Sequence, residues 1–289
     1  MPGVPATFSG LCRAKTCGLA LHLIVESAIN QLAVPLMFWI KMKIQFDTAF
    51  NSSYLCQPVY TIEGKLLAVE LICRFSSADS KLVMPTELVL NLLTPQQLLR
   101  FLNEQQVWAD QHAQWFNDNQ VILNISVEEK QVALLLADEN LREAFKAHPF
   151  IHLNLSESFP QLSQGRNNIQ LVALKQDFTL WLENFGSGNI TMAPIFDHLF
   201  QWVKLDKNLF WQLYEGEHFT IVMPSLIRNV NRFCRNIVVD GLDSQEYFDA
   251  LHKKDIQGVK GLLWPGVDPA EMDSLLNRPV QFHSSSLPS

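Results

Sequence analysis

The sequence predicts an α/β fold, a (β/α)8 barrel of the TIM type. From Lys43 onward, short apolar runs alternate with longer amphipathic segments, a pattern typical of parallel β-α units. Roughly seven or eight such units occupy about 240 residues, which is the length of one barrel. No dinucleotide fingerprint or P-loop follows the first strand, which weakens the alternative of an open, doubly wound sheet.

Short apolar runs predict the strands, and apolar residues spaced three and four apart predict the helices. The predicted strands are Leu66–Phe75, Val121–Ser126, Ile151–Leu155, Phe178–Glu183, Val203–Asp206, Asn236–Asp240 and Val259–Trp264. The predicted helices are Pro85–Asn117, Val127–Ala147, Met192–Trp202, Phe210–Phe233 with a break near Pro224, Ser244–Lys253 and Asp268–Leu276. Asp268 is the expected N-cap of the last helix, and Pro269 follows it at the first helical position. The segment Phe159–Asn168 contains proline, glycine and paired asparagines, so we expect a loop or a frayed helix start there.

The composition argues against several classes of function. Hydrophobic residues make up 48% of the chain and charged residues 18%, which allows a large core. The net charge of -7 and the lack of a dense basic block disfavour direct nucleic-acid binding. The five cysteines form no C-x-x-C pair, so we expect neither a disulfide framework nor a zinc site. A reducing compartment, the cytoplasm, fits best.

The N-terminus differs from the rest of the chain. Residues 19–40 are rich in apolar side chains, but Glu26 interrupts the run, and an ionised glutamate near the centre of a bilayer is costly. We expect residues 1–41 to be an extension outside the fold, with translation starting at Met42 or Met37. A membrane anchor at residues 19–40 is the alternative. The barrel is expected over residues 42–280, and residues 281–289 as a loose tail.

Polar residues stand at the ends of successive predicted strands, where barrel enzymes place their chemistry. They are Glu70 and Arg74, Asn124 and Ser126, Asn154, Ser156 and Glu157, Glu183 and Asn184, Lys204 and Asp206, and Asp240 and Asp243. Residues two apart in a strand point to the same side, so Asn124 with Ser126 and Lys204 with Asp206 form two such pairs. We expect these polar groups to gather at one end of the barrel.

These motifs resemble the EAL domain family, which hydrolyses cyclic di-GMP with two divalent metal ions. The resemblance runs from about Gln57 to Pro265, with Glu70-Leu71-Ile72 where the family has Glu-Ala-Leu. It implies the following roles: metal ligands Glu70 and Asn124, a substrate contact at Arg74, Lys204 near the attacking water, and Asp206 as a neighbouring acid.

Several positions depart from the family pattern. Asn154 stands where the family has a ligand glutamate, and Glu183-Asn184 replaces a pair of aspartates. Asp240 is one methylene shorter than the family's glutamate, and Lys260-Gly261 takes the place of Gln-Gly, with Gln257-Gly258 as another register.

Two divalent cations need several carboxylates to offset their mutual repulsion, so these changes are expected to disable the site. The vestigial metal ligands would be Glu70, Asn124, Asn154, Glu183, Asn184 and Asp240, and the catalytic remnants Glu70, Lys204, Asp206 and Asp240. No competent catalytic residue and no cofactor are expected, except Mg²⁺ or Mn²⁺ if some activity remains.

A degenerate branch of the family, the EAL-like anti-FlhDC factors, shares further details with this sequence. They include Met84–Val89, the segment Gln164–Asn168 and the Gly261–Pro265 end. The resemblance implies a bacterial regulator that represses motility by binding the flagellar master transcription activator, with weak or absent binding of cyclic di-GMP. Two alternatives stay open: a weak metal-dependent phosphodiesterase, and a cyclic-di-GMP receptor that uses Arg74 without cutting.

Overall fold

The computed structural model describes residues 50–77, 83–188, 192–234 and 236–282. The predicted N-terminal extension, with its candidate anchor at residues 19–40 and the start at Met42 or Met37, lies outside the described residues. So do residues 283–289 of the predicted tail. Within the described part of the chain, no helix is long and apolar enough to cross a membrane.

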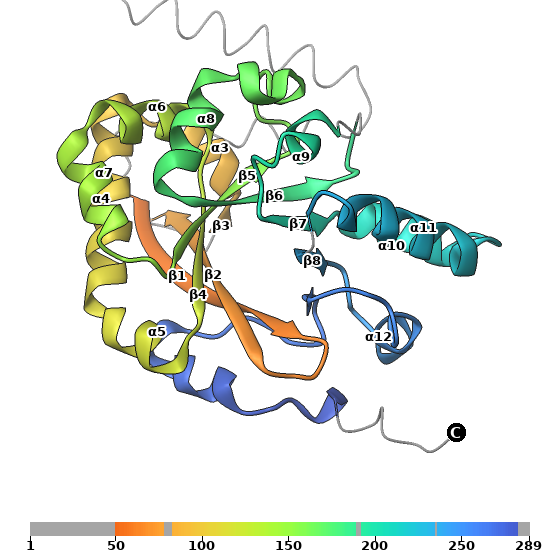
Figure 1. Ribbon diagram of the computed structural model, residues 1–289. Helices are drawn as coiled ribbons and strands as arrows, with labels where there is room; N and C mark the ends of the chain where they lie inside the picture. Colours follow the sequence, from red (N-terminus) through yellow and green to blue (C-terminus); the bar gives the residue numbers. More distant parts are fainter. Residues whose placement is uncertain (1–49, 78–82, 189–191, 235, 283–289) are drawn as a thin grey trace, which may run out of the picture. The chain divides into compact units, whose positions relative to one another are not determined.

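Eight strands close into a barrel, which confirms the predicted fold class (Figure 1). Their order is β1-β9-β8-β7-β6-β5-β4-β2, and β1 closes the ring by pairing with β2 as well as β9. β1 is antiparallel to both neighbours, while the other pairs around the ring are parallel. The strands are β1 (Phe50–Thr61), β2 (Leu66–Ser77), β4 (Ile122–Ser126), β5 (Ile151–Ser156), β6 (Thr179–Phe185), β7 (Trp202–Leu205), β8 (Asn236–Val239) and β9 (Gly258–Val259). The short strand β3 (Val83–Met84) pairs with the end of β2.

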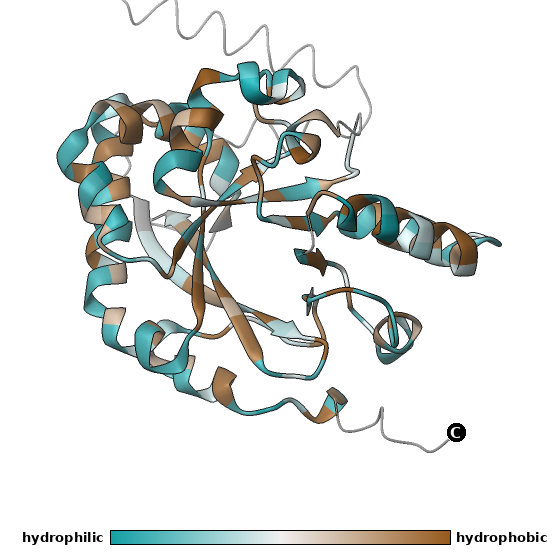
Figure 2. Cartoon of the chain, in the orientation of Figure 1, coloured by the Kyte–Doolittle hydropathy of each residue, from teal (hydrophilic) through white to brown (hydrophobic). Residues whose placement is uncertain are grey.

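Helices cover the outside of the strands, and apolar residues are concentrated on the strands themselves (Figures 1 and 2). Between β3 and β6 lie α3 (Thr86–Leu92), α4 (Pro95–Gln111), α5 (Ala113–Asn119), α6 (Glu129–Ala137), α7 (Glu139–Lys146), the 3-10 helix η1 (Leu162–Asn167) and α8 (Ile169–Asp177). After β6 come α9 (Ala193–Phe196), α10 (Lys207–Glu215), α11 (Phe219–Asn231), α12 (Gln245–Ala250), and the 3-10 helices η2 (Pro269–Leu276) and η3 (Val280–Phe282).

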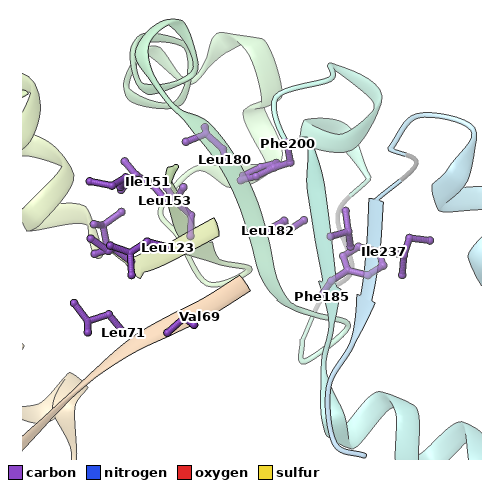
Figure 3. Close-up of a cluster of buried hydrophobic side chains, with 14 of the residues drawn as sticks. Val69, Leu71, Leu123, Ile151, Leu153, Leu180, Leu182, Phe185, Phe200 and Ile237 are labelled. Carbon is purple, nitrogen blue, oxygen red and sulfur yellow. The ribbon is translucent and has the colours of Figure 1, made fainter. Parts of the chain in front are cut away.

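Alternation along the strands separates two apolar layers. Residues such as Val69, Leu71 and Leu123 belong to the main core between strands and helices (Figure 3). A second, separate cluster holds Val59, Ala68, Trp181 and Val238, one residue out of phase with the first. Because neighbouring residues of a strand point to opposite sides, this second cluster fills the inside of the barrel.

Trp181 is the centre of the inner cluster. Its ring stacks on Trp202 with centroids 4.4 Å apart, and its Nε1 donates a 2.8 Å hydrogen bond to His152 Nδ1. Burial lowers the pKa of His152 to about 4, so this histidine is neutral near pH 7. The barrel interior therefore has a packed aromatic floor beneath the strand ends.

Several local predictions were wrong. β1 was not predicted, the predicted helix Met192–Trp202 is only α9, and the last predicted strand shrinks to β9. The break predicted at Pro224 occurs instead between α10 and α11, and α11 runs through the proline. The two long helices predicted before and after β4 are divided into α3, α4 and α5, and into α6 and α7; Asp138 caps the start of α7. Asp268 caps η2 as predicted, but the segment is a 3-10 helix.

The packed structure reaches Phe282. Its ring stacks on Trp264 at 4.9 Å and meets Tyr60 edge-on at 5.7 Å, and the side chain is buried. The first two residues of the predicted tail, 281 and 282, thus belong to η3.

Candidate functional site

A layer of polar side chains sits directly above the aromatic floor of the barrel. Glu70 follows Ala68 by two residues, Glu183 follows Trp181, and Asp240 follows Val238. The same spacing brings Asn124, Asn154, Lys204 and Lys260 to the inner side of their own strands or strand ends. Because a spacing of two keeps a strand residue on the same side, all seven point into the barrel towards its carboxyl end. The predicted gathering of polar groups therefore takes place for Glu70, Asn124, Asn154, Glu183, Lys204 and Asp240.

Five of these side chains form one chain of ion pairs. Lys204 Nζ lies 2.6 Å from Glu70 Oε1 and 3.1 Å from Glu183 Oε2. Lys260 Nζ lies 2.6 Å from Glu70 Oε2 and 3.1 Å from Asp240 Oδ2. Each lysine thus bridges two carboxylates, and Glu70 gives one oxygen to each lysine. With three carboxylates and two ammonium groups, the charges nearly cancel. We call this set the charged layer.

The electrostatics agree with this arrangement. Burial alone would raise the pKa of Glu70, but Lys204 and Lys260 outweigh it and hold the pKa at about 2. Burial would likewise lower the pKa of both lysines, yet the neighbouring carboxylates raise it above the ordinary lysine value. All three groups therefore stay ionised across the physiological range.

Two buried asparagines lie beside the charged layer. Asn124 is opposite Glu70 in the ladder between β4 and β2, and Asn154 is on the next strand, β5. Each side chain is only 1% exposed, and neither amide oxygen nor amide nitrogen has a hydrogen-bond partner among the described residues. Among the described residues of the predicted ligand set, only Asn124 and Asn154 have a side-chain oxygen that is buried and bonds to neither a lysine nor the backbone.

Of the other predicted residues, Ser126 contacts the charged layer, since its Oγ donates a 3.3 Å hydrogen bond to Glu183 Oε2, whereas Asp206, Arg74 and Asn184 have other surroundings. Asp206 follows β7 and caps α10, where its Oδ1 accepts hydrogen bonds from Asn208 N at 2.9 Å and Leu209 N at 3.2 Å. Arg74 lies further along β2, about 13 Å from Glu70 at the rise of a strand, and is exposed. Asn184 has a left-handed backbone (φ 55°) and begins a turn closed by Ser187 N.

The geometry also decides the register at the end of the barrel. Lys260 reaches the charged layer, whereas Gln257 lies at the other end of β8, where its Oε1 accepts from Ile237 N at 2.8 Å. Of the two predicted registers, the structure therefore supports the first, in which Lys260-Gly261 stands where the family has Gln-Gly.

Sequence reasoning missed the role of Glu157. Its Oε2 accepts hydrogen bonds from Gly186 N at 3.1 Å and Gly188 N at 3.2 Å, and from Ser187 Oγ at 3.4 Å. A single carboxylate thus fixes the glycine loop that follows β6. The sequence did contain a signal for this contact: a glutamate at the end of one strand and a glycine-rich loop at the end of the next. The backbone N–H groups of such loops bind anions, so the pair could have predicted the contact.

The described residues do not fit the two divalent cations that the family resemblance implies. Both oxygens of Glu70 contact lysine ammonium groups, and Lys260 occupies the space between Glu70 and Asp240. Asn124 and Asn154 offer only neutral amide oxygens, which cannot offset the repulsion between two cations. Within the described part of the chain, no three His, Cys, Asp or Glu side chains are arranged to hold a metal ion.

Comparisons with known proteins agree with the fold. The family model of the EAL domain matches residues 49–265. YdiV of Escherichia coli is 30% identical over 237 residues, which cover 82% of this chain and 100% of that protein. The anti-FlhC(2)FlhD(4) factor YdiV of Salmonella paratyphi B is 29% identical over 237 residues, with the same coverage.

Among solved structures, the crystal structure of the EAL-like domain protein YdiV is similar, with a TM-score of 0.75 and 29% identity. The match covers 80% of this chain and 98% of that one. Because the family model matches residues 49–265, which is most of the sequence, this chain belongs to the EAL domain family.

Proposed function

We propose that this chain is a non-catalytic regulator that binds the flagellar master regulator FlhC(2)FlhD(4) and so lowers flagellar gene expression and motility. The observation that carries the proposal is the charged layer, in which two lysines contact the carboxylates that would otherwise face metal ions. The identity of 30% with YdiV, over the whole length of that protein, supports the choice of partner.

The chemistry of the charged layer supports a protein that does not hydrolyse cyclic di-GMP. In two-metal hydrolysis the cations generate the attacking hydroxide and stabilise the leaving oxygen. Here a cation would have to displace an ammonium group that lies 2.6 Å from Glu70. We propose that neither Mg²⁺ nor Mn²⁺ is held and that no hydroxide is generated.

The same arrangement lets the fold stand without a cofactor. Buried carboxylates are costly unless they are paired. Lys204 and Lys260 provide that pairing within the chain itself, so the barrel needs no metal to compensate Glu70. A barrel of this kind is suited to binding a protein on its outer surface. A regulator of a transcription factor would act in the cytoplasm.

The test is direct binding of purified protein to purified FlhC(2)FlhD(4), measured by calorimetry. We expect saturable binding at micromolar or lower concentration. The control variant is Lys65→Met, which alters an exposed lysine directly before β2 that takes no part in the charged layer and should bind equally well. Absence of binding at about 50 µM protein contradicts the proposed partner, since such an interaction would be weaker than regulatory complexes usually are.

One observation favours a second candidate, a receptor that binds cyclic di-GMP without cutting it. The guanidinium of Arg74 is exposed, with no hydrogen bond or ion pair to any described residue, and a guanidinium suits phosphate. Calorimetry with cyclic di-GMP tests this candidate. Binding that is lost in Arg74→Ala supports a receptor, and absence of binding to the wild-type protein excludes it.

A further inference from the structure

A hollow lined by carboxamide side chains lies between β5 and α8, and none of its lining residues belongs to the charged layer. Its volume is about 350 Å³. The lining residues are Glu129, Pro160, Gln161, Gln164, Asn167, Asn168, Ile169 and Gln170. We call this feature the carboxamide hollow. Five of its eight residues carry a side-chain amide, and one carries a formal charge, so the hollow is polar but nearly neutral.

The backbone that frames the hollow is held in place by Asp197, the residue after α9. Asp197 Oδ2 accepts a hydrogen bond from Arg166 N at 2.7 Å, and its Oδ1 contacts the Arg166 guanidinium at 2.8 Å and 2.9 Å. Gly165 has a φ of 54°, and a Cβ there would collide with the Asp197 carboxylate. The turn therefore requires glycine, and its conformation is fixed by a charged contact from another part of the chain.

Asn168 fixes the other side of the hollow. Its side chain is buried, donates to Pro160 O at 3.0 Å and Gln161 O at 3.3 Å, and caps α8 by accepting from Leu171 N at 3.2 Å. Both ends of the segment are thus tied, so its side chains are presented from a defined backbone.

Three carboxamide side chains over this frame have no hydrogen-bond partner among the described residues. Gln161, Gln164 and Asn167 are exposed, and their carboxamides make no hydrogen bond to any described residue. Ile169 is 84% exposed, more than any other large apolar side chain in the described part of the protein. A rigid frame therefore presents unpaired donors and acceptors around one exposed apolar side chain.

We infer that the carboxamide hollow is the surface on which the protein partner docks, and that it takes an extended, uncharged peptide segment of that partner. A carboxamide both donates and accepts, as a peptide group does, so a ring of them matches the backbone of an extended segment. Ile169 supplies the apolar contact that such a segment needs for affinity. The inference rests on the proposed function, because the partner is FlhC(2)FlhD(4).

The chemistry of the lining argues against other ligands. A nucleic acid requires free cations, but no lysine or arginine lines the hollow, and the adjacent Arg166 is paired with Asp197. A sugar or a nucleotide base would be expected to stack on an aromatic ring, and none lines the hollow.

The experiment compares binding of FlhC(2)FlhD(4) to the full chain and to three variants by calorimetry. Ile169→Asp and the double variant Gln164→Ala with Asn167→Ala alter the hollow. Ile221→Asp is the matched control, since Ile221 is 67% exposed on α11. All four proteins should melt at similar temperatures, because the altered side chains are exposed.

We expect Ile169→Asp to raise the Kd by about tenfold or more and the double variant by several-fold, with Ile221→Asp within about twofold of wild type. Wild-type binding that Ile169→Asp leaves unchanged overturns the inference and leaves the proposed function standing. Equal weakening by Ile169→Asp and Ile221→Asp also overturns it.

Two further outcomes count against the hollow as the docking surface. No binding by the wild-type protein overturns the proposed function and this inference with it. A wild-type dimer in sedimentation that Ile169→Asp dissolves would assign the hollow to a second copy of the chain instead.

Discussion

Replacing Lys260 with methionine removes one of the two ammonium groups of the charged layer and keeps most of the side-chain volume. Lys260 lies 2.6 Å from Glu70 Oε2 and 3.1 Å from Asp240 Oδ2, so both oxygens lose their cation. Removing one partner of a buried ion pair typically costs 3–5 kcal/mol, and the partial exposure of Lys260 (16%) places the expected loss near the lower end, about 3 kcal/mol. For a domain of this size that corresponds to a fall in Tm of roughly 6–12 °C.

The assay is urea unfolding followed by tryptophan fluorescence, with Lys65→Met and Lys260→Arg as controls. Lys65 is exposed, so its substitution should change stability by less than about 0.5 kcal/mol. Lys260→Arg keeps the positive charge and should lose less stability than Lys260→Met.

The pH dependence of the effect gives a second check. The pKa of Glu70 is lowered from 4.5 to about 2, so its pairing stabilises the fold above pH 4.5. That contribution is lost as the pH falls towards 2, and the difference between wild type and Lys260→Met should shrink over this range. Equal stability of the two proteins at pH 7 would show that the ammonium group does not hold the carboxylates, which refutes the reasoning.

Two other predictions concern the floor and the loop. His152 has a pKa of about 4 in the folded protein and 6.5 in the unfolded chain, so the free energy of unfolding should decline as the pH falls below 6.5, by up to about 3 kcal/mol at pH 4. A His152→Gln variant still offers a hydrogen-bond acceptor to Trp181. In urea melts at a series of pH values, this variant should lose that part of the acid dependence. Glu157→Gln replaces a charged hydrogen-bond acceptor by a neutral one, so amide hydrogen exchange at Gly186 and Gly188 should speed up about tenfold. Unchanged exchange rates would show that the carboxylate does not fix the loop.

The sequence predicts the parallel part of the barrel because its strands are short, apolar and bounded by turns. It does not predict β1, whose residues mix serine, asparagine and proline and whose pairing with β2 and β9 is antiparallel. The helix break at Pro224 was wrong for a different reason. Met223, Ile227 and Val230 are buried in the core, and their packing offsets the local cost of proline, about 3 kcal/mol.

For the site, the sequence identifies the residue types but not their partners. Strand-end spacing and the family resemblance point to Glu70, Glu183 and Asp240. Lys204 joins Glu70 to Glu183, and Lys260 joins Glu70 to Asp240. These contacts depend on the closure of the barrel, which brings distant strands together. Asp206 was expected near the site, but its position after the end of β7 gives it the role of a helix cap.

The most direct test of the account is a calorimetric titration of the purified wild-type protein with Mn²⁺ at pH 7.5. If Lys204 and Lys260 satisfy the carboxylates as described, millimolar Mn²⁺ should produce no saturable heat of binding and no rise in Tm. Saturable binding of two Mn²⁺ ions per chain at micromolar concentration would contradict the account, because it would mean that the lysines yield the site to metal.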